Sequence, residues 1–83
     1  MPHTAIHDFA EAGDVAAIER LLEDGVAVST KDDTGCTALH HAKNKHVAEL
    51  LIRHGADVKA RQDDDETPLH RAAWHGHKDI AEL

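Results

Sequence analysis

Nine histidines are the residues of this 83-residue chain that first suggest chemistry. Imidazole nitrogens bind zinc and other transition metals, and they gain or lose a proton near neutral pH. Two interpretations compete: the histidines bind metal, or a repeated motif places them at equivalent positions. The spacing of His7, His40 and His70 favours the second, because each closes the same four-residue pattern of threonine, a small residue or proline, an aliphatic residue and histidine.

Metal binding by these histidines meets two obstacles. Equivalent residues of stacked helices lie roughly 8–10 Å apart, whereas zinc–nitrogen bonds are about 2 Å long, so His7, His40 and His70 cannot share one ion. The pair His75 and His77 needs at least one further ligand, and the sequence supplies no obvious one. The sequence therefore predicts neither a metal nor any other cofactor.

Acidic residues form two short runs, Asp32-Asp33 and residues 63–66. A calcium loop needs alternating ligands, a central glycine and a distal glutamate, and this spacing is absent. Two interpretations stay open for the acidic runs. Either they are solvated turns, or they form an electronegative ridge that meets a basic partner.

Cys36 is the only cysteine, so neither an intrachain disulfide nor a multi-cysteine zinc site is possible. It precedes a predicted helix, and a helix N-terminus can activate a thiol, but no histidine or basic residue is clearly paired with it. We therefore expect a spectator thiol. No glycine-rich phosphate loop, nucleophile elbow or unexplained carboxylate pair is present, so the sequence does not indicate an enzyme.

Composition narrows the class of protein further. Sixteen acidic and nine basic residues give a formal charge of −7, which disfavours binding to nucleic acid or to an anionic membrane. No apolar run approaches the roughly 20 residues of a membrane span, and the N-terminus lacks the features of a secretory signal. We expect a cytoplasmic protein, or a nuclear one. Because aromatic residues make up only 2%, the core must consist of alanine, leucine, isoleucine and valine.

The elements that position these residues recur along the chain. The pattern ending at His7 returns 33 residues later at His40, and again 30 residues later at His70. A second pattern, residues 21–28, returns 30 residues later at residues 51–58. Two patterns in the same phase indicate structural repeats.

Each repeat predicts two short helices followed by a polar loop. The threonine at the head of the pattern is a good N-cap, and Pro68 falls at the first helical position, where its missing N–H costs nothing. Asp14 is the predicted N-cap of a second helix that ends at Gly25. The apolar side chains with helical spacing are Leu69, Ala72 and Ala73 in a first helix, and Val15, Ile18, Leu21 and Leu22 in a second. No unit can bury such a stripe alone, so the units must stack as a solenoid.

These residues resemble the ankyrin-repeat family. Residues 67–77, Thr-Pro-Leu-His-Arg-Ala-Ala-Trp-His-Gly-His, match the family's TPLHxAAxxGH, and residues 53–58 match its second landmark, xHGADV. The resemblance covers residues 4–83 and implies an all-α ankyrin-repeat solenoid of helix-turn-helix units joined by hairpin-like loops. It also implies that His7, His40 and His70 tie the start of each first helix to neighbouring backbone.

We expect a single domain over residues 1–83, with repeats at 4–34, 35–64 and 65–83. The second repeat is three residues short, which predicts a clipped first helix or an irregular turn at residues 43–46. In the third repeat, Asp65 replaces the turn glycine equivalent to Gly35, and we expect only a mild backbone cost there.

The third repeat also stops early, at Leu83. This predicts an uncovered apolar end at Ile80, Ala81 and Leu83, because repeat arrays generally need a polar terminal unit. The simplest interpretation is that the chain is the N-terminal part of a longer array. The alternative is that another surface covers the open end.

The resemblance implies a protein-binding module without catalytic activity, whose partner lies on the concave face formed by the loop tips and the exposed side of the first helices. Trp74 falls at a position that usually faces this groove, so it is either a binding hot spot or a cover for the open end of the core. Cys36 falls at a position that is usually exposed, and the acidic tips favour a basic partner segment. The residues predicted to contact a partner are Asp33, Thr34, Cys36, Asp63, Asp64, Glu66, Trp74 and His75.

Two alternative functions stay open. The chain is a structural or assembly segment of a longer array or homo-oligomer, and it self-associates through the exposed C-terminal apolar end. Alternatively, its histidines form a metal site or a pH sensor, since protonating all nine changes the formal charge from −7 to +2.

Overall fold

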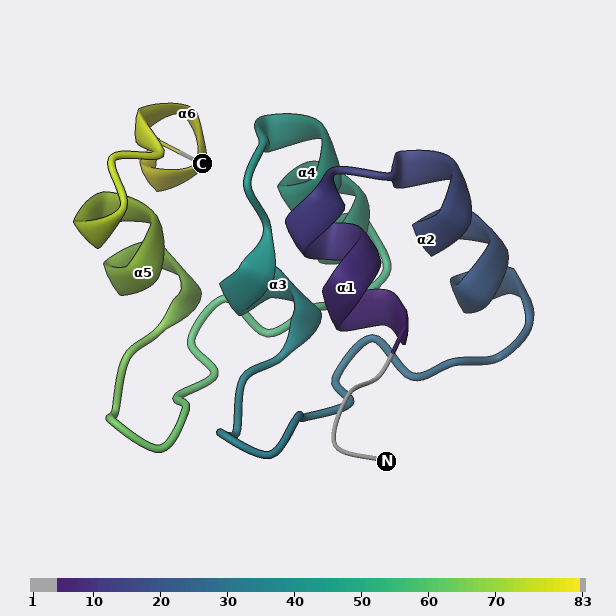
Figure 1. The fold of residues 1–83 in the computed structure, drawn as a ribbon, viewed down its shortest axis with the longest axis horizontal. Coiled ribbons are helices and arrows are strands. Elements are labelled where there is room, and N and C mark those ends of the chain that lie inside the picture. Colours follow the sequence, from purple (N-terminus) through teal and green to yellow (C-terminus); the bar gives the residue numbers. More distant parts are fainter. Residues whose placement is uncertain (1–4, 83) are drawn as a thin grey trace.

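The computed structural model describes residues 5–82, and within this range the chain forms six helices and no strand. The helices are α1 (Ala5–Ala12), α2 (Val15–Glu23), α3 (Ala38–His41), α4 (Lys45–Arg53), α5 (Pro68–Trp74) and α6 (Lys78–Ala81). Consecutive helices pair as α1–α2, α3–α4 and α5–α6 (Figure 1). The first helices also pack in the order α1, α3, α5, and the second helices in the order α2, α4, α6. The predicted all-α stack of helix-turn-helix units is confirmed.

Polar side chains begin several of these helices, and the cap at Asp14 is the one that the sequence predicts. Oδ1 of Asp14 accepts a hydrogen bond from the amide of Ala17 at 3.1 Å, three residues into α2. Asn44 accepts one from the amide of Val47 at 2.9 Å at the start of α4. Amides of the first turn have no partner within a helix, so such caps replace a missing hydrogen bond.

The first helix of the second repeat is clipped. α3 has only four residues, and the backbone leaves the helical region at Ala42, where φ is −62° and ψ is 130°. The chain then reaches Asn44, which caps α4. The missing three residues therefore shorten α3 and the turn that follows it, and the expectation of a clipped first helix is confirmed. The irregular segment is limited to residues 42–44, because Lys45 and His46 already belong to α4.

The core lies between the two rows of helices and consists of aliphatic side chains and alanines. Alanines on the first helices, such as Ala10, Ala38 and Ala72, are buried and let these helices approach closely. The other buried apolar residues are Ile6, Ile18, Leu39, Ala42, Val47, Ala48, Leu50, Leu51 and Ile80. Most of them belong to the second repeat, which has a neighbour on each side.

The open end differs from the prediction in one respect. Ile80, expected to be exposed, is only 2% exposed, because α6 packs against α4. Ala81 is half-buried, and Leu83 lies outside the described residues. Leu69, expected in the core, is instead 40% exposed, because no described element packs on the outer side of α5.

Candidate protein-binding face

The loop before α3 ends in a tight turn, residues 32–35, which we call the first tip. Oδ1 of Asp32 accepts hydrogen bonds at 2.9 Å from the amides of Thr34 and Cys36 and from the Thr34 hydroxyl. The backbone amide of Asp32 donates to the carbonyl of Cys36 at 2.9 Å, which closes the loop. One carboxylate oxygen therefore holds the whole turn.

The second tip, residues 62–65, is built in the same way around Gln62. Its amide donates to the carbonyl of Glu66 at 3.0 Å, and its side-chain Oε1 accepts from the amides of Asp64 and Glu66. Asp65 adopts φ of +65° in this turn, the left-handed region that Gly35 occupies in the first tip. Aspartate tolerates that region better than most residues, so the turn forms without a glycine.

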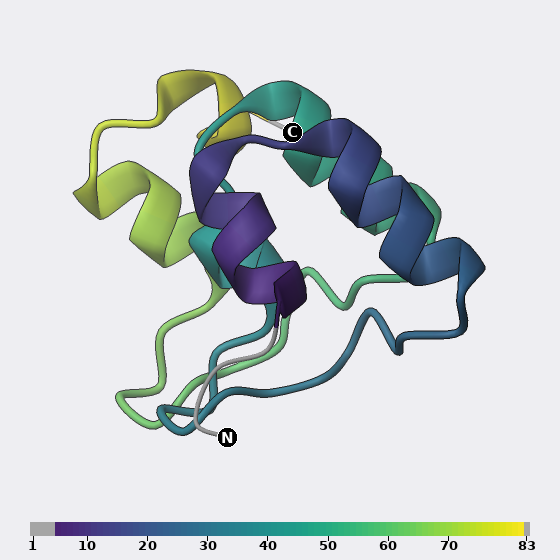
Figure 2. The same cartoon turned by 45° about the vertical axis from the view of Figure 1, so that its right-hand side comes forward.

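The two tips lie side by side and project from the same end of the helix stack (Figure 2). The amide of Asp63 donates to the carbonyl of Thr34 at 3.0 Å and joins them directly. Gly35 makes this approach possible, because a Cβ there would lie 2.6 Å from Oδ1 of Asp63. The acidic side chains of successive repeats are thereby brought together.

Most residues predicted to contact a partner are exposed. Asp33, Thr34, Asp63 and Asp64 on the tips face solvent, so the aspartates of the tips present negative charge. Glu66 is half-buried, and its Oε1 lies 3.7 Å from Nη1 of Arg71. This pair fastens the second tip to α5.

Trp74 ends α5, and its side chain is 82% exposed. The alternative in which this indole folds over the open end of the core is therefore wrong. His75 follows it and is also exposed. The rings of His75 and His77 stack with their centroids 6.0 Å apart.

Cys36 is only 2% exposed, so the expectation that it is exposed is wrong. Its backbone amide donates to Asp32, and its carbonyl accepts from Nε2 of His7 at 2.7 Å. These bonds draw the residue under the tip and against the first helices. Cys36 therefore supports the tip from within and does not belong to its surface.

The three repeated histidines tie helix starts to backbone, as the resemblance implies. Nε2 of His40 bonds to the carbonyl of Glu66 at 2.9 Å, as His7 does to Cys36 one repeat earlier. Nδ1 of His40 accepts from the amide of Thr37 at 3.0 Å, and Nδ1 of His70 accepts from that of Thr67 at 3.2 Å. His40 and His70 thus close their own helix starts, and His7 and His40 each hold the next loop.

Burial lowers the pKa of the His40 imidazole. The hydrogen bond to the carbonyl of Glu66 raises this pKa, and the positive charge of nearby Arg71 lowers it. The net effect is a lowered pKa, so His40 stays neutral at neutral pH.

Sequence reasoning missed one contact beneath the first tip. Nε2 of His41 lies 2.9 Å from Oδ2 of Asp32. Burial by itself raises the pKa of the Asp32 carboxyl, but the hydrogen bonds from His41, Thr34 and Cys36 together hold it well below its usual range. The signal in the sequence was the spacing Asp32-x3-Cys36-x4-His41, which does not show how the loop folds back onto α3.

An apolar groove of about 490 Å³ opens between the second and third repeats. Val58 and Leu69 are its exposed apolar residues, at 39% and 40%. Leu39, Ile52 and Ile80 form its floor, and Lys59 and Thr67 complete the lining.

Over the described residues, no helix is long and apolar enough to cross a bilayer.

Comparison with known proteins agrees with this architecture. The family described as ankyrin repeats, in three copies, matches residues 6–83. The Notch-regulated ankyrin repeat-containing protein of Xenopus laevis is 32% identical over 89 residues, a match that covers 96% of this chain and 78% of that protein.

Two longer relatives share only this segment. The tyrosine-protein kinase Shark of Drosophila melanogaster is 38% identical over 77 residues, which cover 88% of this chain but 8% of the kinase. The inactive serine/threonine-protein kinase TEX14 of Bos taurus is 32% identical over 76 residues, 88% of this chain and 5% of that protein. The shared part is the repeat itself, a non-catalytic fold that generally serves protein interaction. The chain belongs to the ankyrin-repeat family.

Proposed function

We propose that this chain binds a protein partner through a face that extends from the two acidic tips along the exposed side of α5 to Trp74. The exposed indole carries the proposal. An 82% exposed tryptophan keeps a large apolar surface in water, and tryptophan is among the residues that most often dominate binding energy. The stacked first helices form a rigid support beneath it.

The charge of the tips favours a basic segment as the partner. Asp33, Asp63 and Asp64 are exposed, and the bond between Asp63 and Thr34 keeps the two tips together. Opposite charge speeds encounter and sets orientation more than it adds affinity. In this proposal Trp74 supplies affinity, and the tips select a lysine- or arginine-bearing segment. Cys36 is left out of the face because it is buried.

Affinity capture with a matched pair of variants tests this face. The first variant, Trp74→Ala/Asp63→Lys/Asp64→Lys, is expected to lose proteins that the unmodified chain captures. The control, Glu19→Lys/Glu23→Lys, changes the charge equally at exposed sites on α2 and is expected to keep them. Capture should also weaken with added salt. Identical captured sets for the unmodified chain and the first variant would refute the proposed face.

The apolar groove between the second and third repeats supports a second candidate function, assembly of this chain with another copy. Val58 and Leu69 expose apolar surface at the rim of this groove, and Leu39, Ile52 and Ile80 form its floor. Exposed apolar surface of this kind often marks an interaction site. We expect a dimer by light scattering after size exclusion at tens of micromolar chain. Val58→Glu/Leu69→Glu should return it to a monomer. A monomer at every concentration would exclude assembly through this groove.

A further inference from the structure

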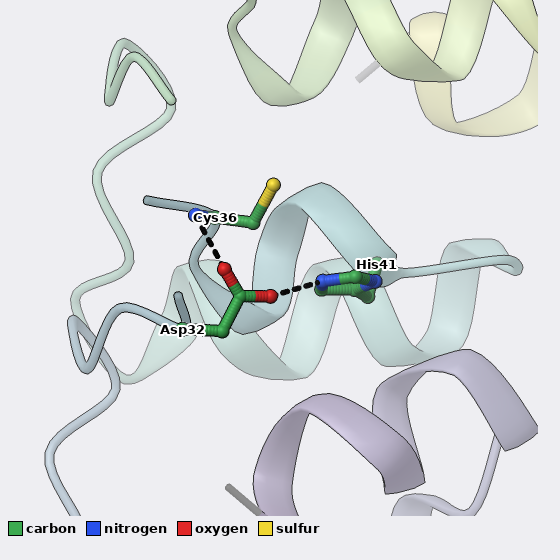
Figure 3. Close-up of side chains that lie close together, drawn as sticks. All are labelled: Asp32, Cys36 and His41. Carbon is green, nitrogen blue, oxygen red and sulfur yellow. Dashed lines mark hydrogen bonds and ion pairs between the residues drawn. The ribbon is translucent and has the colours of Figure 1, made fainter. Parts of the chain in front are cut away.

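Asp32, Cys36 and His41 bring three different metal-ligating side chains together beneath the first tip (Figure 3). One donor atom of each residue lies within 4.8 Å of the donor atoms of the other two. Zinc bonds oxygen and nitrogen at about 2.0–2.2 Å and sulfur at about 2.3 Å, so neighbouring ligand atoms of a tetrahedral site lie roughly 3.3–3.7 Å apart. Side-chain shifts of about 1 Å therefore bring the three donors to bonding distance of one ion.

The turn holds two of these donors in place. Three hydrogen bonds at 2.9 Å occupy Oδ1 of Asp32, which leaves Oδ2 directed at His41. The backbone of Cys36 is held from both sides, by Asp32 through its amide and by His7 through its carbonyl. The Thr34 hydroxyl lies 3.4 Å from the Cys36 sulfur, and it can donate its one proton to a thiolate there in place of Oδ1 of Asp32. Such supporting hydrogen bonds orient metal ligands before the ion arrives.

Comparison with the next repeat shows that the turn does not require these ligands. The equivalent positions, 30 residues later, are Gln62, Glu66 and Arg71. There an ion pair between Arg71 and Glu66 fastens the tip to the helix, and a guanidinium does not ligate metal in proteins because it stays protonated. The Cys36 thiol and the His41 imidazole are thus not needed for this turn to form.

We propose that Asp32, Cys36 and His41 bind a zinc-like divalent transition-metal ion, with a fourth position left for water or for a partner's side chain. One oxygen, one sulfur and one nitrogen donor suit zinc better than magnesium or calcium, which prefer oxygen alone. On binding, the thiol proton passes to solvent and the hydrogen bond between Nε2 of His41 and Oδ2 of Asp32 is broken. The Nε2 proton moves through solvent to Nδ1, so Nε2 ligates the ion as part of a neutral imidazole. The His41 side chain is 20% exposed, which gives the ion a path from solvent.

Cobalt(II) titration of the 83-residue chain, with a non-thiol reductant present, tests the site. We expect one equivalent to produce a thiolate-to-cobalt charge-transfer band together with the visible bands of a four-coordinate ion, and zinc to displace it. Cys36→Ser should abolish the charge-transfer band. Asp32→Asn, which keeps the oxygen that holds the turn, and His41→Ala should each weaken binding at least tenfold.

The matched control removes the other histidine pair. His75→Ala/His77→Ala should leave the titration unchanged. The proposal fails if no thiolate band appears, if the band survives Cys36→Ser, or if the control variant loses it. Circular dichroism of each variant shows whether it is folded. If Asp32→Asn unfolds, Cys36→Ser and His41→Ala still decide the outcome.

Discussion

Asp32 and Gln62 occupy equivalent positions and satisfy the amides of equivalent turns with different chemistry. The Asp32 carboxylate is charged and also accepts a hydrogen bond from His41. The Gln62 side chain is neutral, and at the second tip the ion pair between Glu66 and Arg71 joins the loop to α5. A carboxylate accepts stronger hydrogen bonds than an amide oxygen. The first tip therefore has stronger hydrogen bonds than the second, although the backbone forms a similar turn in both.

Gly35 is expected to be the glycine least tolerant of substitution among those that join repeats. Gly35→Ala and Gly25→Ala both place an L-residue at positive φ, +77° and +95°, at a cost of about 1–2 kcal/mol each. Only at Gly35 does the new Cβ also meet Asp63, whereas nothing lies within 4 Å at Gly25. Urea unfolding should show a further loss of about 1 kcal/mol or more for Gly35→Ala. Equal losses would mean that the tips separate easily.

His40 should make the stability of the fold depend on pH. Its pKa is lowered in the folded chain, so below about pH 6.5 the unfolded state takes up a proton that the folded state does not bind. The free energy of unfolding should therefore fall as the pH drops from about 6.5 through the folded pKa. Proton NMR of the His40 ring should give a titration midpoint below 6.5. A midpoint above that value would contradict the burial effect.

Among the elements, α3 shows how a deletion is absorbed by the repeat. The helix keeps its threonine and histidine at the start but loses its last turn, and Ala42 turns the chain directly toward α4. Ala38, Leu39 and His40 stay buried. The start of the helix carries the contacts with its neighbours, so the repeat keeps its packing while the turn is lost.

Asn44 should matter more than an ordinary surface residue because it begins α4 directly after this shortened connection. Asn44→Ala removes the hydrogen bond to the amide of Val47 and should cost about 1 kcal/mol of unfolding free energy. Asn44→Asp keeps an acceptor at the same place and should restore most of the loss. Thermal melts followed by circular dichroism measure both variants. If Asn44→Ala leaves the stability unchanged, packing alone holds the start of α4.

At the scale of the whole molecule, the second repeat is the centre of stability. α3 packs between α1 and α5, and α4 packs between α2 and α6. The outer repeats each have one covered side, which is why Leu69 stays partly exposed. In a stack of this kind stability is the sum of unit and interface contributions.

Two leucine-to-alanine variants should separate the centre from the open end. Leu51 is fully buried, so Leu51→Ala should cost about 2–5 kcal/mol of unfolding free energy. Leu69→Ala changes the same atoms at a 40% exposed site and should cost less than about 1 kcal/mol. Urea unfolding of both variants provides the comparison. A large loss for Leu69→Ala would indicate that the groove is covered in solution.

The repeat, the fold class and the starts of α2, α3 and α5 could be predicted from the sequence alone, and the role of the repeated histidines from the resemblance to the ankyrin-repeat family. These features depend on residues close together in the chain, or on the recurrence of one pattern every 30 or so residues. Threonine, proline and aspartate act within a single turn of helix, so their roles at the helix starts could be predicted directly. The clipped α3 was predictable for the same reason, because a missing turn is a local deletion.

What the tips and the last repeat present to solvent depends on tertiary packing. Whether Trp74 covers the core, whether Ile80 is buried and whether Cys36 reaches the surface depend on how neighbouring helices and loops pack. Asp32, Cys36 and His41 are near in sequence, yet they meet only because the loop folds back onto α3 and His7 holds it there. Burial depends on which surfaces the other repeats cover, and the spacing of residues in one repeat does not contain that information.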